Sequence, residues 1–231
     1  MSINVVVFNS SPNEDHGNTQ KVLNPIIEGM KNSGANVDVY YTHRMHIEKC
    51  RGCTENINFE STGKCIVVDD MQYIYPKMKK ADLWVFASPN YEKVINNSLI
   101  RLFDRLEPLF ETYPTFVNGN GNTNAKKGKI LLVSVSTEFG NEGFEKLIEQ
   151  VKSLSDMFNR EFIGSVLRSS SWVLSENGIV PDSIEQLYKT LKKAGEEITQ
   201  TGKLSKTILK EVNKELINRK SFLANIFSEM N

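Results

Sequence analysis

The sequence predicts an α/β fold in which helices cover both faces of a single parallel sheet. Residues 3–8 form a continuous apolar run rich in β-branched residues, as expected of a strand that is buried on both faces, and four further short runs have strand character. Segments whose apolar residues recur at helical spacing separate these runs. Strands that alternate with helices indicate βαβ units, and 231 residues are enough for one such domain with a modest extension.

The strands are expected in the apolar runs 3–8, 37–41, 83–87, 130–135 and 162–167. The first run, INVVVF, is continuous, and the last is the weakest. Five parallel strands fit the flavodoxin-like order 2-1-3-4-5, a three-layer sandwich of helices, sheet and helices. In this order a ligand lies at the switch point between the first and third strands.

The helices are expected where apolar residues share one face. The first helix covers the stripe from Val22 to Met30 and ends near Gly34. Pro25 lies inside this helix and lacks a backbone N–H donor, which predicts either a kink or a late helix start. Three further stripes consist of Ile95, Leu99, Leu102, Phe103 and Leu106; of Phe144, Leu147, Ile148, Val151 and Leu154; and of Ile184, Leu187, Tyr188, Leu191 and Ile198.

Two segments exceed a minimal five-stranded domain. The connection 42–82 is long for one crossover and carries all three cysteines. The tail 203–231 has a helical apolar pattern, so we expect a main domain over 1–200 and a helical C-terminal extension over 201–231. The loop 118–124 (NGNGNTN) has no GxGxxG pattern after a strand, which argues against a dinucleotide-binding fingerprint.

Composition excludes several classes of protein. The chain has 28 basic and 28 acidic residues and so lacks the basic excess of a nucleic-acid binder. No apolar run approaches the ~20 residues that span a bilayer, and the N-terminus enters a strand without the basic region of a signal peptide. Three cysteines without a secretory signal indicate a reducing compartment. We therefore expect a cytoplasmic protein with neither a nucleic-acid nor a membrane partner.

The loop after the first strand has the character of a phosphate site. It contains Ser11, Asn13, Asn18 and Thr19 and leads into a helix N-terminus. Free backbone N–H groups and the positive end of the helix dipole favour an anion there. The side chains of Ser11, Asn18 and Thr19 can add hydrogen bonds. The alternative is an ordinary helix cap without a ligand, because Asn and Thr are common capping residues.

Two further polar loops are expected at the same sheet edge. Pro89, Asn90 and Tyr91 follow the third strand, and Ser136 and Thr137 follow the fourth. Because the carboxyl ends of parallel strands meet at one edge, these loops converge on the first one. Tyr91 then offers an aromatic ring beside a flat ligand. The alternative for the segment 89–91 is a turn with a partly buried tyrosine.

Several motifs together resemble a known group of flavoproteins. Residues 10–13 and 17–19 are similar to the phosphate loop G-S-P-R…G-N-T of that group, and residues 50–53 and 63–71 are similar to its C-x-G-C…G-x-C-x3-D-D-M pattern. Residues 89–91 are similar to its P-x-Y loop, and residues 104–105 are similar to the D-R end of the helix that follows this loop. The joined cysteine and D-D-M pattern is the most specific of these. Over roughly residues 1–200 the chain resembles the NADPH-dependent FMN reductase and iron–sulfur flavoprotein branch of the flavodoxin-like superfamily.

The resemblance implies an enzyme that holds FMN and transfers electrons from NAD(P)H to a small acceptor such as a quinone, a flavin or a nitroaromatic compound. It also implies a homodimer whose FMN-binding domain covers 1–200, and it assigns no catalytic residue. The residues that it assigns to cofactor binding are Ser11, Asn13, Asn18, Thr19, Pro89, Asn90, Tyr91, Ser136 and Thr137.

Two positions depart from the pattern of that group. Asn13 replaces its basic residue, which weakens phosphate binding, and Glu92 follows Tyr91 where many relatives have an apolar residue. Two other functions therefore stay open, namely a non-enzymatic FMN electron carrier and a flavodoxin-fold scaffold that has lost the cofactor. The neutral chain shows no acidic excess for docking a redox partner, which weighs against the carrier.

Cys50, Cys53 and Cys65 are one thiolate short of the usual four ligands of a [4Fe–4S] cluster. His43 and His46 precede them in an H-x2-H-x3-C-x2-C pattern, whose ligand count suffices for zinc although its spacing is unusual. A redox disulfide within the C-x2-C pair is a further alternative. We expect a structural or incidental role for the three cysteines, no bound metal and no iron–sulfur cluster.

Overall fold

A computed structural model describes residues 2–53, 65–109, 128–175, 180–220 and 222–223. Its strands form one five-stranded parallel sheet in the order β2-β1-β3-β4-β5, which confirms the predicted class and strand order. The loop 118–124 lies outside the described residues. The strands are β1 (Asn4–Asn9), β2 (Asn36–Tyr41), β3 (Leu83–Pro89), β4 (Lys129–Val135) and β5 (Glu161–Arg168).

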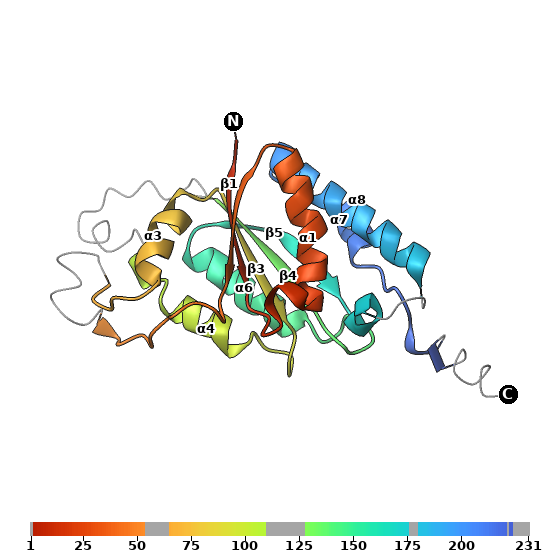
Figure 1. Ribbon diagram of the computed structural model, residues 1–231, viewed down its shortest axis with the longest axis horizontal. Helices are drawn as coiled ribbons and strands as arrows, with labels where there is room; N and C mark the ends of the chain where they lie inside the picture. The colour runs from red at the N-terminus through yellow and green to blue at the C-terminus, as the bar shows by residue number, and fades with distance from the viewer. Residues whose placement is uncertain (1, 54–64, 110–127, 176–179, 221, 224–231) are drawn as a thin grey trace.

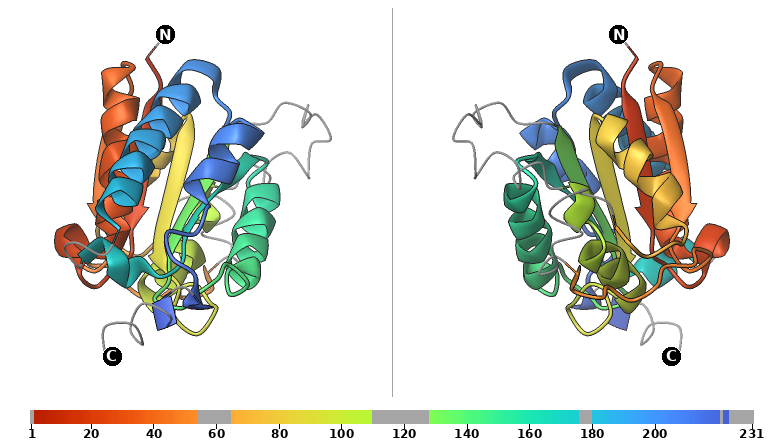
Figure 2. Two further views of the ribbon diagram at one scale, coloured as in Figure 1. Left: turned by 90° about the vertical axis from the view of Figure 1, so that its right-hand side faces the viewer. Right: turned by 90° about the vertical axis from the view of Figure 1, so that its left-hand side faces the viewer.

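Helices cover both faces of the sheet (Figures 1 and 2). One face carries α1 (Asn18–Asn32) and α7 (Pro181–Thr201), and the other carries α3 (Met71–Lys80), α4 (Asn97–Asp104) and α6 (Glu145–Met157). The connections contain the short 3-10 helices η1 (Glu14–His16), η3 (Glu107–Leu109) and η4 (Ser171–Ser175). No helix of the described chain is long and apolar enough to cross a membrane.

Strand side chains alternate between two hydrophobic cores because successive residues of a strand point to opposite faces. In β1, Val5 and Val7 belong to the core under α1 and α7, whereas Val6 and Phe8 belong to the opposite core. All seven residues of β3 are buried, as expected for a central parallel strand. The continuous apolar runs of the sequence therefore reflect burial on both faces.

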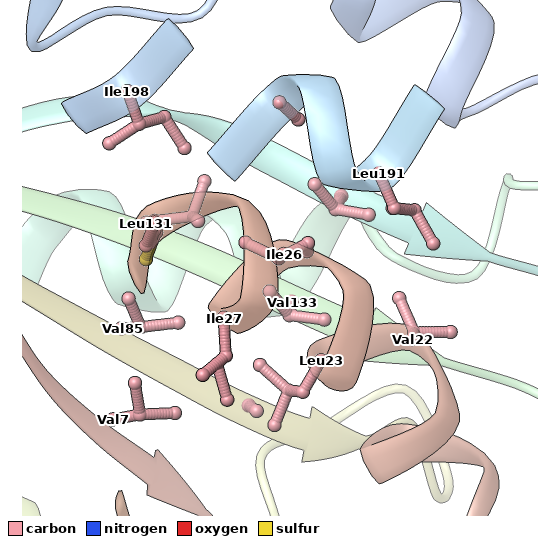
Figure 3. Packing of buried hydrophobic residues seen from close by; sticks show 14 of the residues in the cluster. Val7, Val22, Leu23, Ile26, Ile27, Val85, Leu131, Val133, Leu191 and Ile198 are labelled. Carbon is pink, nitrogen blue, oxygen red and sulfur yellow. The ribbon is translucent and has the colours of Figure 1, made fainter. Parts of the chain in front are cut away.

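Helix α1 packs against both the sheet and α7 (Figure 3). Its residues Leu23 and Ile26 pack with Val85 of the sheet and Leu191 of α7. The helix begins at Asn18 and continues through Pro25 to Asn32, so the late start that Pro25 suggested does not occur.

Helices α1 and α7 approach closely through two glycines. A Cβ atom at Gly29 would lie 2.0 Å from the carbonyl oxygen of Lys192, and a Cβ atom at Gly195 would lie 2.0 Å from the carbonyl oxygen of Ile26. Real Cβ atoms do not approach a backbone oxygen this closely, so any larger residue at either position would push the helices apart. The two glycines therefore determine how closely α1 and α7 pack against each other.

A buried ion pair ties the cysteine-bearing connection to the end of α4. The Nη atoms of Arg105 lie 2.5 and 3.2 Å from the carboxylate oxygens of Asp69, and these two side chains are 1% and 0% exposed. Arg105 also donates to the carbonyl oxygen of Glu48 (2.8 Å) and lies 3.3 Å from Sγ of Cys65. The D-D-M and D-R motifs of the sequence therefore meet in space and hold the crossover on the sheet.

The helical C-terminal extension is present and packs on the sheet of its own chain. Helix α8 (Lys206–Val212) lies beside β5, and Asn213 follows it. The Asn213 side chain accepts from the N–H of Leu167 (2.7 Å) and donates to the carbonyl oxygen of Ser165 (3.0 Å). Asn213 therefore satisfies backbone groups on the outer side of an edge strand, which would otherwise be open to another chain.

Candidate functional site

The loops after β1, β3, β4 and β5 meet at one edge of the sheet, at the bottom of Figure 1 where the strand arrows end. Backbone hydrogen bonds join neighbouring loops. Asn90 N donates to Val135 O (2.7 Å), and Ser171 N donates to Ser136 O (2.8 Å). The residues predicted to bind the cofactor all lie at this edge, namely Ser11, Asn13, Asn18, Thr19, Pro89, Asn90, Tyr91, Ser136 and Thr137.

Helix α1 begins at this edge without a capping side chain. Its N-cap is Gly17, with extended backbone (φ −75°, ψ 160°), and no acidic residue lies in its first turn. A Cβ atom at Gly17 would lie 2.8 Å from Oγ of Ser11, so the loop folds tightly against the helix start. Asn18 and Thr19 follow the cap position, so neither acts as the ordinary N-cap considered as the alternative.

The hydroxyl group of Thr19 is buried without a hydrogen-bond partner. The residue is 1% exposed, and its Oγ1 contacts no donor or acceptor of the described chain. An unsatisfied buried polar group costs about 1–3 kcal/mol, so such a group in a native structure calls for an explanation such as a bound ligand. The uncapped N–H groups and the helix dipole favour an anion at the same place. The start of α1 thus offers the donors that a phosphate needs.

Two asparagines hold this loop in place through hydrogen bonds, and neither was among the residues predicted from the sequence. Asn9 accepts from the N–H of Ser11 (2.9 Å) through Oδ1 and donates to Oε1 of Gln20 (2.8 Å) through Nδ2. Asn96 donates from Nδ2 to the carbonyl oxygen of Ser10. A signal for Asn9 did exist in the sequence, because it is a polar residue directly after an apolar strand run. In the structure Asn9 is 0% exposed.

The loop after β3 combines a buried amide with a tight turn. Asn90 is 9% exposed, donates to the carbonyl oxygen of Gly143 (3.0 Å), and keeps a buried Oδ1 without a partner. Tyr91 is 50% exposed and begins a turn over Glu92 and Lys93, whose φ angles are 52° and 61°. This left-handed region is uncommon for non-glycine residues. The turn presents Glu92 to solvent.

The loops after β4 and β5 complete the edge. Ser136 is buried, and its Oγ accepts from the N–H of Glu138 (3.1 Å), whereas Thr137 is exposed. Ser170 is buried with φ of 50°, and its Oγ has no partner in the described chain. Unpartnered buried polar atoms therefore occur after β3 and β5 as well as at the start of α1.

An aromatic cluster links the β4 and β5 loops to the C-terminal extension. The ring centroids of Phe139 and Trp172 are 6.1 Å apart, and Phe222 lies 5.7 and 5.0 Å from them. Arg168, the last residue of β5, is buried and donates to the carbonyl oxygen of Lys214, and burial lowers the pKa of this arginine to about 10. The extension thus reaches the candidate site from the β5 side.

The cysteines do not form a metal site in the described part of the chain. Cys50 is exposed, Cys53 is buried, Cys65 is half-buried, and all three are free. His46 lies 3.0 Å from the Glu48 carboxylate, and no group of three or more His, Cys, Asp or Glu side chains among the described residues could hold a metal ion. The zinc alternative therefore has no support from the geometry. The absence of an iron–sulfur cluster stays a prediction, and iron and sulfide analysis of anaerobically purified protein checks it.

The chain is similar to several iron–sulfur flavoproteins. One from Methanocaldococcus jannaschii is 29% identical over 105 residues, which cover 46% of this chain and 52% of the relative. One from Methanosarcina thermophila is 30% identical over 88 residues, which cover 38% of this chain and 44% of the relative. The chain spans about half the length, or less, of these relatives.

Solved structures with a similar fold include two redox enzymes. An NAD(P)H:quinone oxidoreductase from Methanothermobacter marburgensis matches with a TM-score of 0.57 and 17% identity, over 86% of this chain and 98% of that one. An FMN-dependent NADH-azoreductase from Bacillus anthracis, in complex with FMN, matches with a TM-score of 0.58 and 13% identity, over 85% and 99%. At these identities the likeness establishes the fold alone.

The match to a protein family is broader. The family described as NADPH-dependent FMN reductase matches residues 3–176, a segment that holds all five strands and all the loops at the carboxyl edge. The match therefore includes every residue predicted to bind the cofactor. The chain belongs to the NADPH-dependent FMN reductase family.

Proposed function

We propose that the protein holds FMN and uses it to transfer electrons from NAD(P)H to a small acceptor of the quinone, flavin or nitroaromatic type. The observation that carries the proposal is the uncapped start of α1, where Thr19 keeps a buried, unpartnered hydroxyl beside the switch point between β1 and β3. Family membership supports FMN among the phosphate-bearing ligands. So does the likeness in fold to an FMN-dependent azoreductase.

The residues at the start of α1 fit the phosphate of this cofactor. Thr19 would donate its free hydroxyl, Asn18 its side-chain amide, and Ser11 and the first turn of the helix their hydroxyl and backbone N–H groups. Asn13 lies exposed at the N-cap of η1. Its neutral side chain provides no charge for the phosphate.

The loops after β3 and β4 would flank the ring system. The unpartnered Oδ1 of Asn90 is a buried acceptor that suits a ring N–H, and the half-exposed Tyr91 offers an aromatic face. Pro89 ends β3 and sets the direction of this loop, while Ser136 and Thr137 approach from β4. When bound, FMN supplies the electron-transfer chemistry. The chain's own residues bind it, orient it and exclude water from one side.

Three features of the whole protein belong to the proposed function. The protein works in the cytoplasm, it forms a homodimer, and residues 1–200 make up the FMN-binding domain, with 201–231 as an extension. The packing of α8 and Asn213 on β5 supports an extension that serves the same domain.

Absorption spectroscopy followed by anaerobic stopped-flow tests the function. The purified protein, reconstituted with FMN, should show a bound-flavin spectrum. NADH or NADPH should bleach this spectrum, and a quinone should restore it. A protein that takes up no FMN would support the scaffold that has lost its cofactor. Bleaching by dithionite but by neither nucleotide within minutes would support the electron carrier.

A further inference from the structure

Resting on the proposed function, we propose that Lys21 supplies the positive charge for the flavin phosphate that Asn13 does not provide. Ser175 connects this lysine to Asn18 and turns the donor end of the Asn18 amide toward the phosphate. Lys21 and Ser175 thereby take part in binding, and Asn18 has a defined orientation.

Three hydrogen bonds form the connection. The ammonium group of Lys21 donates to Oγ of Ser175 (2.9 Å) and to the carbonyl oxygen of Leu174 (3.1 Å). Oγ of Ser175 donates to Oδ1 of Asn18 (2.7 Å). Helix α1 and the 3-10 helix η4, which are 157 residues apart along the chain at these positions, are thereby joined at the carboxyl edge of the sheet.

The direction of one bond follows from chemistry and that of the other from the structure. A lysine ammonium group only donates, so Oγ of Ser175 accepts from Lys21 and keeps its single proton. In the structure this proton is donated to Oδ1 of Asn18, which leaves the Nδ2 donors without a partner in the described chain. A phosphate accepts hydrogen bonds only. The hydrogen bond from Ser175 thus assigns Oδ1 and Nδ2 of the Asn18 amide and leaves the Nδ2 donors free for a phosphate.

The electrostatics of the helix start favour an anion. Lys21 lies in the second turn of α1, near the positive end of the helix dipole, where a cation is unfavourable. The first turn contains no acidic residue, and Lys21 forms no ion pair with any described residue. The nearby acids Glu14 and Asp15 both pair with Arg44, at 3.4 Å for Asp15. A bound dianion offsets the charges of Lys21 and of the helix dipole together.

The test compares FMN with riboflavin, which lacks only the phosphate. Dissociation constants are measured by quenching of flavin fluorescence for the wild type, Lys21→Gln and Lys21→Arg. Loss of the charge in Lys21→Gln should weaken FMN binding by about tenfold or more and leave riboflavin binding within about twofold. Lys21→Arg should retain most of the preference for FMN. The matched control is Lys31→Gln, an exposed lysine in the last turn of the same helix, which should behave as the wild type.

Two further variants test the connection. Asn18→Asp keeps the shape of the side chain but replaces the donors with a carboxylate, so it should weaken FMN binding more than Lys21→Gln does. Ser175→Ala should weaken FMN binding less than Lys21→Gln. Salt provides an independent readout, because FMN affinity should fall less steeply with ionic strength in Lys21→Gln than in the wild type.

The outcomes separate this inference from the proposed function. A wild type that prefers FMN strongly over riboflavin, with an unchanged preference in Lys21→Gln, would overturn the role of Lys21 and leave the proposed function intact. An equal loss of FMN and riboflavin affinity in Lys21→Gln would show that the lysine only holds η4 in place. A wild type that binds neither flavin would contradict the proposed function itself.

Discussion

The buried hydroxyl of Thr19 should have opposite effects on the stability of the FMN-free protein and on FMN binding. This hydroxyl is buried at the start of α1 and has no partner in the described chain. A buried hydroxyl that stays unpartnered costs about 1–3 kcal/mol. A phosphate at the uncapped helix end would accept from this hydroxyl. Ligand binding would therefore supply the hydrogen-bond partner that the Thr19 hydroxyl lacks in the described chain.

Replacing Thr19 by valine, which has nearly the same shape, separates the effect of the hydroxyl on stability from its effect on FMN affinity. Thr19→Val should leave the free energy of unfolding of the FMN-free protein unchanged or raise it, because no hydrogen bond is lost. The same change should weaken FMN binding by about tenfold or more, the value of one hydrogen bond to a charged group. Chemical denaturation and fluorescence titration measure the two quantities.

Thr190→Val is the matched control for this change. Its hydroxyl is similarly buried but donates to the carbonyl oxygen of Gln186 within α7 (2.9 Å). This variant should lose stability and keep its FMN affinity. An unchanged FMN affinity in Thr19→Val would reject the placement of the phosphate at the start of α1.

At the scale of elements, the ion pair between Asp69 and Arg105 joins the crossover to α4. Burial raises the pKa of Asp69, but hydrogen bonds from Arg105 and from the backbone N–H groups of Glu48 and Met71 outweigh this effect and hold the pKa below its ordinary value of 3.8. A carboxylate whose pKa is lowered by folding stabilises the protein above that ordinary value. The contribution is lost as the pH falls through the folded value.

Asp69→Asn should therefore lower the free energy of unfolding by about 3–5 kcal/mol near neutral pH, because it leaves the buried Arg105 without its partner. The difference from the wild type should be constant above about pH 5 and should shrink below about pH 4, where Asp69 of the unfolded chain becomes protonated while the folded carboxylate stays charged, and it should be smallest once the pH has fallen through the lowered folded pKa. Urea denaturation at several pH values measures this difference. Asp104→Asn, at an exposed position beside Arg105, should change stability by less than about 0.5 kcal/mol. A constant difference down to pH 2 would contradict the lowered pKa.

The contact between α1 and α7 depends on the two glycines that lie at the crossing. Alanine favours an isolated helix by about 1 kcal/mol over glycine. Gly29→Ala and Gly195→Ala should nevertheless destabilise the protein by about 1–3 kcal/mol or more, because each new Cβ meets a backbone oxygen at 2.0 Å. Lys193→Ala, at an exposed site of α7, should change little. Thermal unfolding compares the three, and a raised melting temperature in either glycine variant would contradict the close packing.

At the scale of the whole molecule, the distribution of apolar surface bears on assembly. The apolar residues in the described part of the C-terminal extension pack on the core and on β5 of their own chain. Exposed apolar side chains remain beside the candidate site, at Tyr91, Val94 and Ile100, with 50%, 41% and 37% exposure. These residues lie in the loop after β3 and on α4.

The homodimer stays a prediction, and we expect its subunit contact to include this surface. Light scattering at micromolar concentration should give twice the mass of the 26.2 kDa chain. Ile100→Glu should shift the protein toward the monomer, because a charge would enter the apolar contact. Met157→Glu, a similar change at an exposed site on α6, should leave the mass unchanged. A monomeric wild type would reject the dimer.

The sequence by itself determined the architecture. Strands and helices follow from the periodicity of apolar residues, which is a local property, and the alternation of the two element types limits the sheet to parallel topologies. The loops that carry Thr19, Asn90 and Ser136 could be located for the same reason, since polar residues directly follow the apolar runs. Parallel strands must bring such loops to a single edge.

Only the tertiary structure decided which groups meet. Lys21 and Ser175 are separated by 154 residues, Asn18 and Ser175 by 157, and Asp69 and Arg105 by 36, and no local pattern encodes these pairs. The same holds for the missing partner of Thr19, because an unsatisfied hydroxyl is recognised only when all its neighbours are known. Periodicity specifies what a segment becomes, whereas hydrogen bonds and ion pairs between distant segments depend on how the elements pack. The departure at Asn13 is visible in the sequence, but the lysine that would compensate for it emerges only from the packing of η4 against α1.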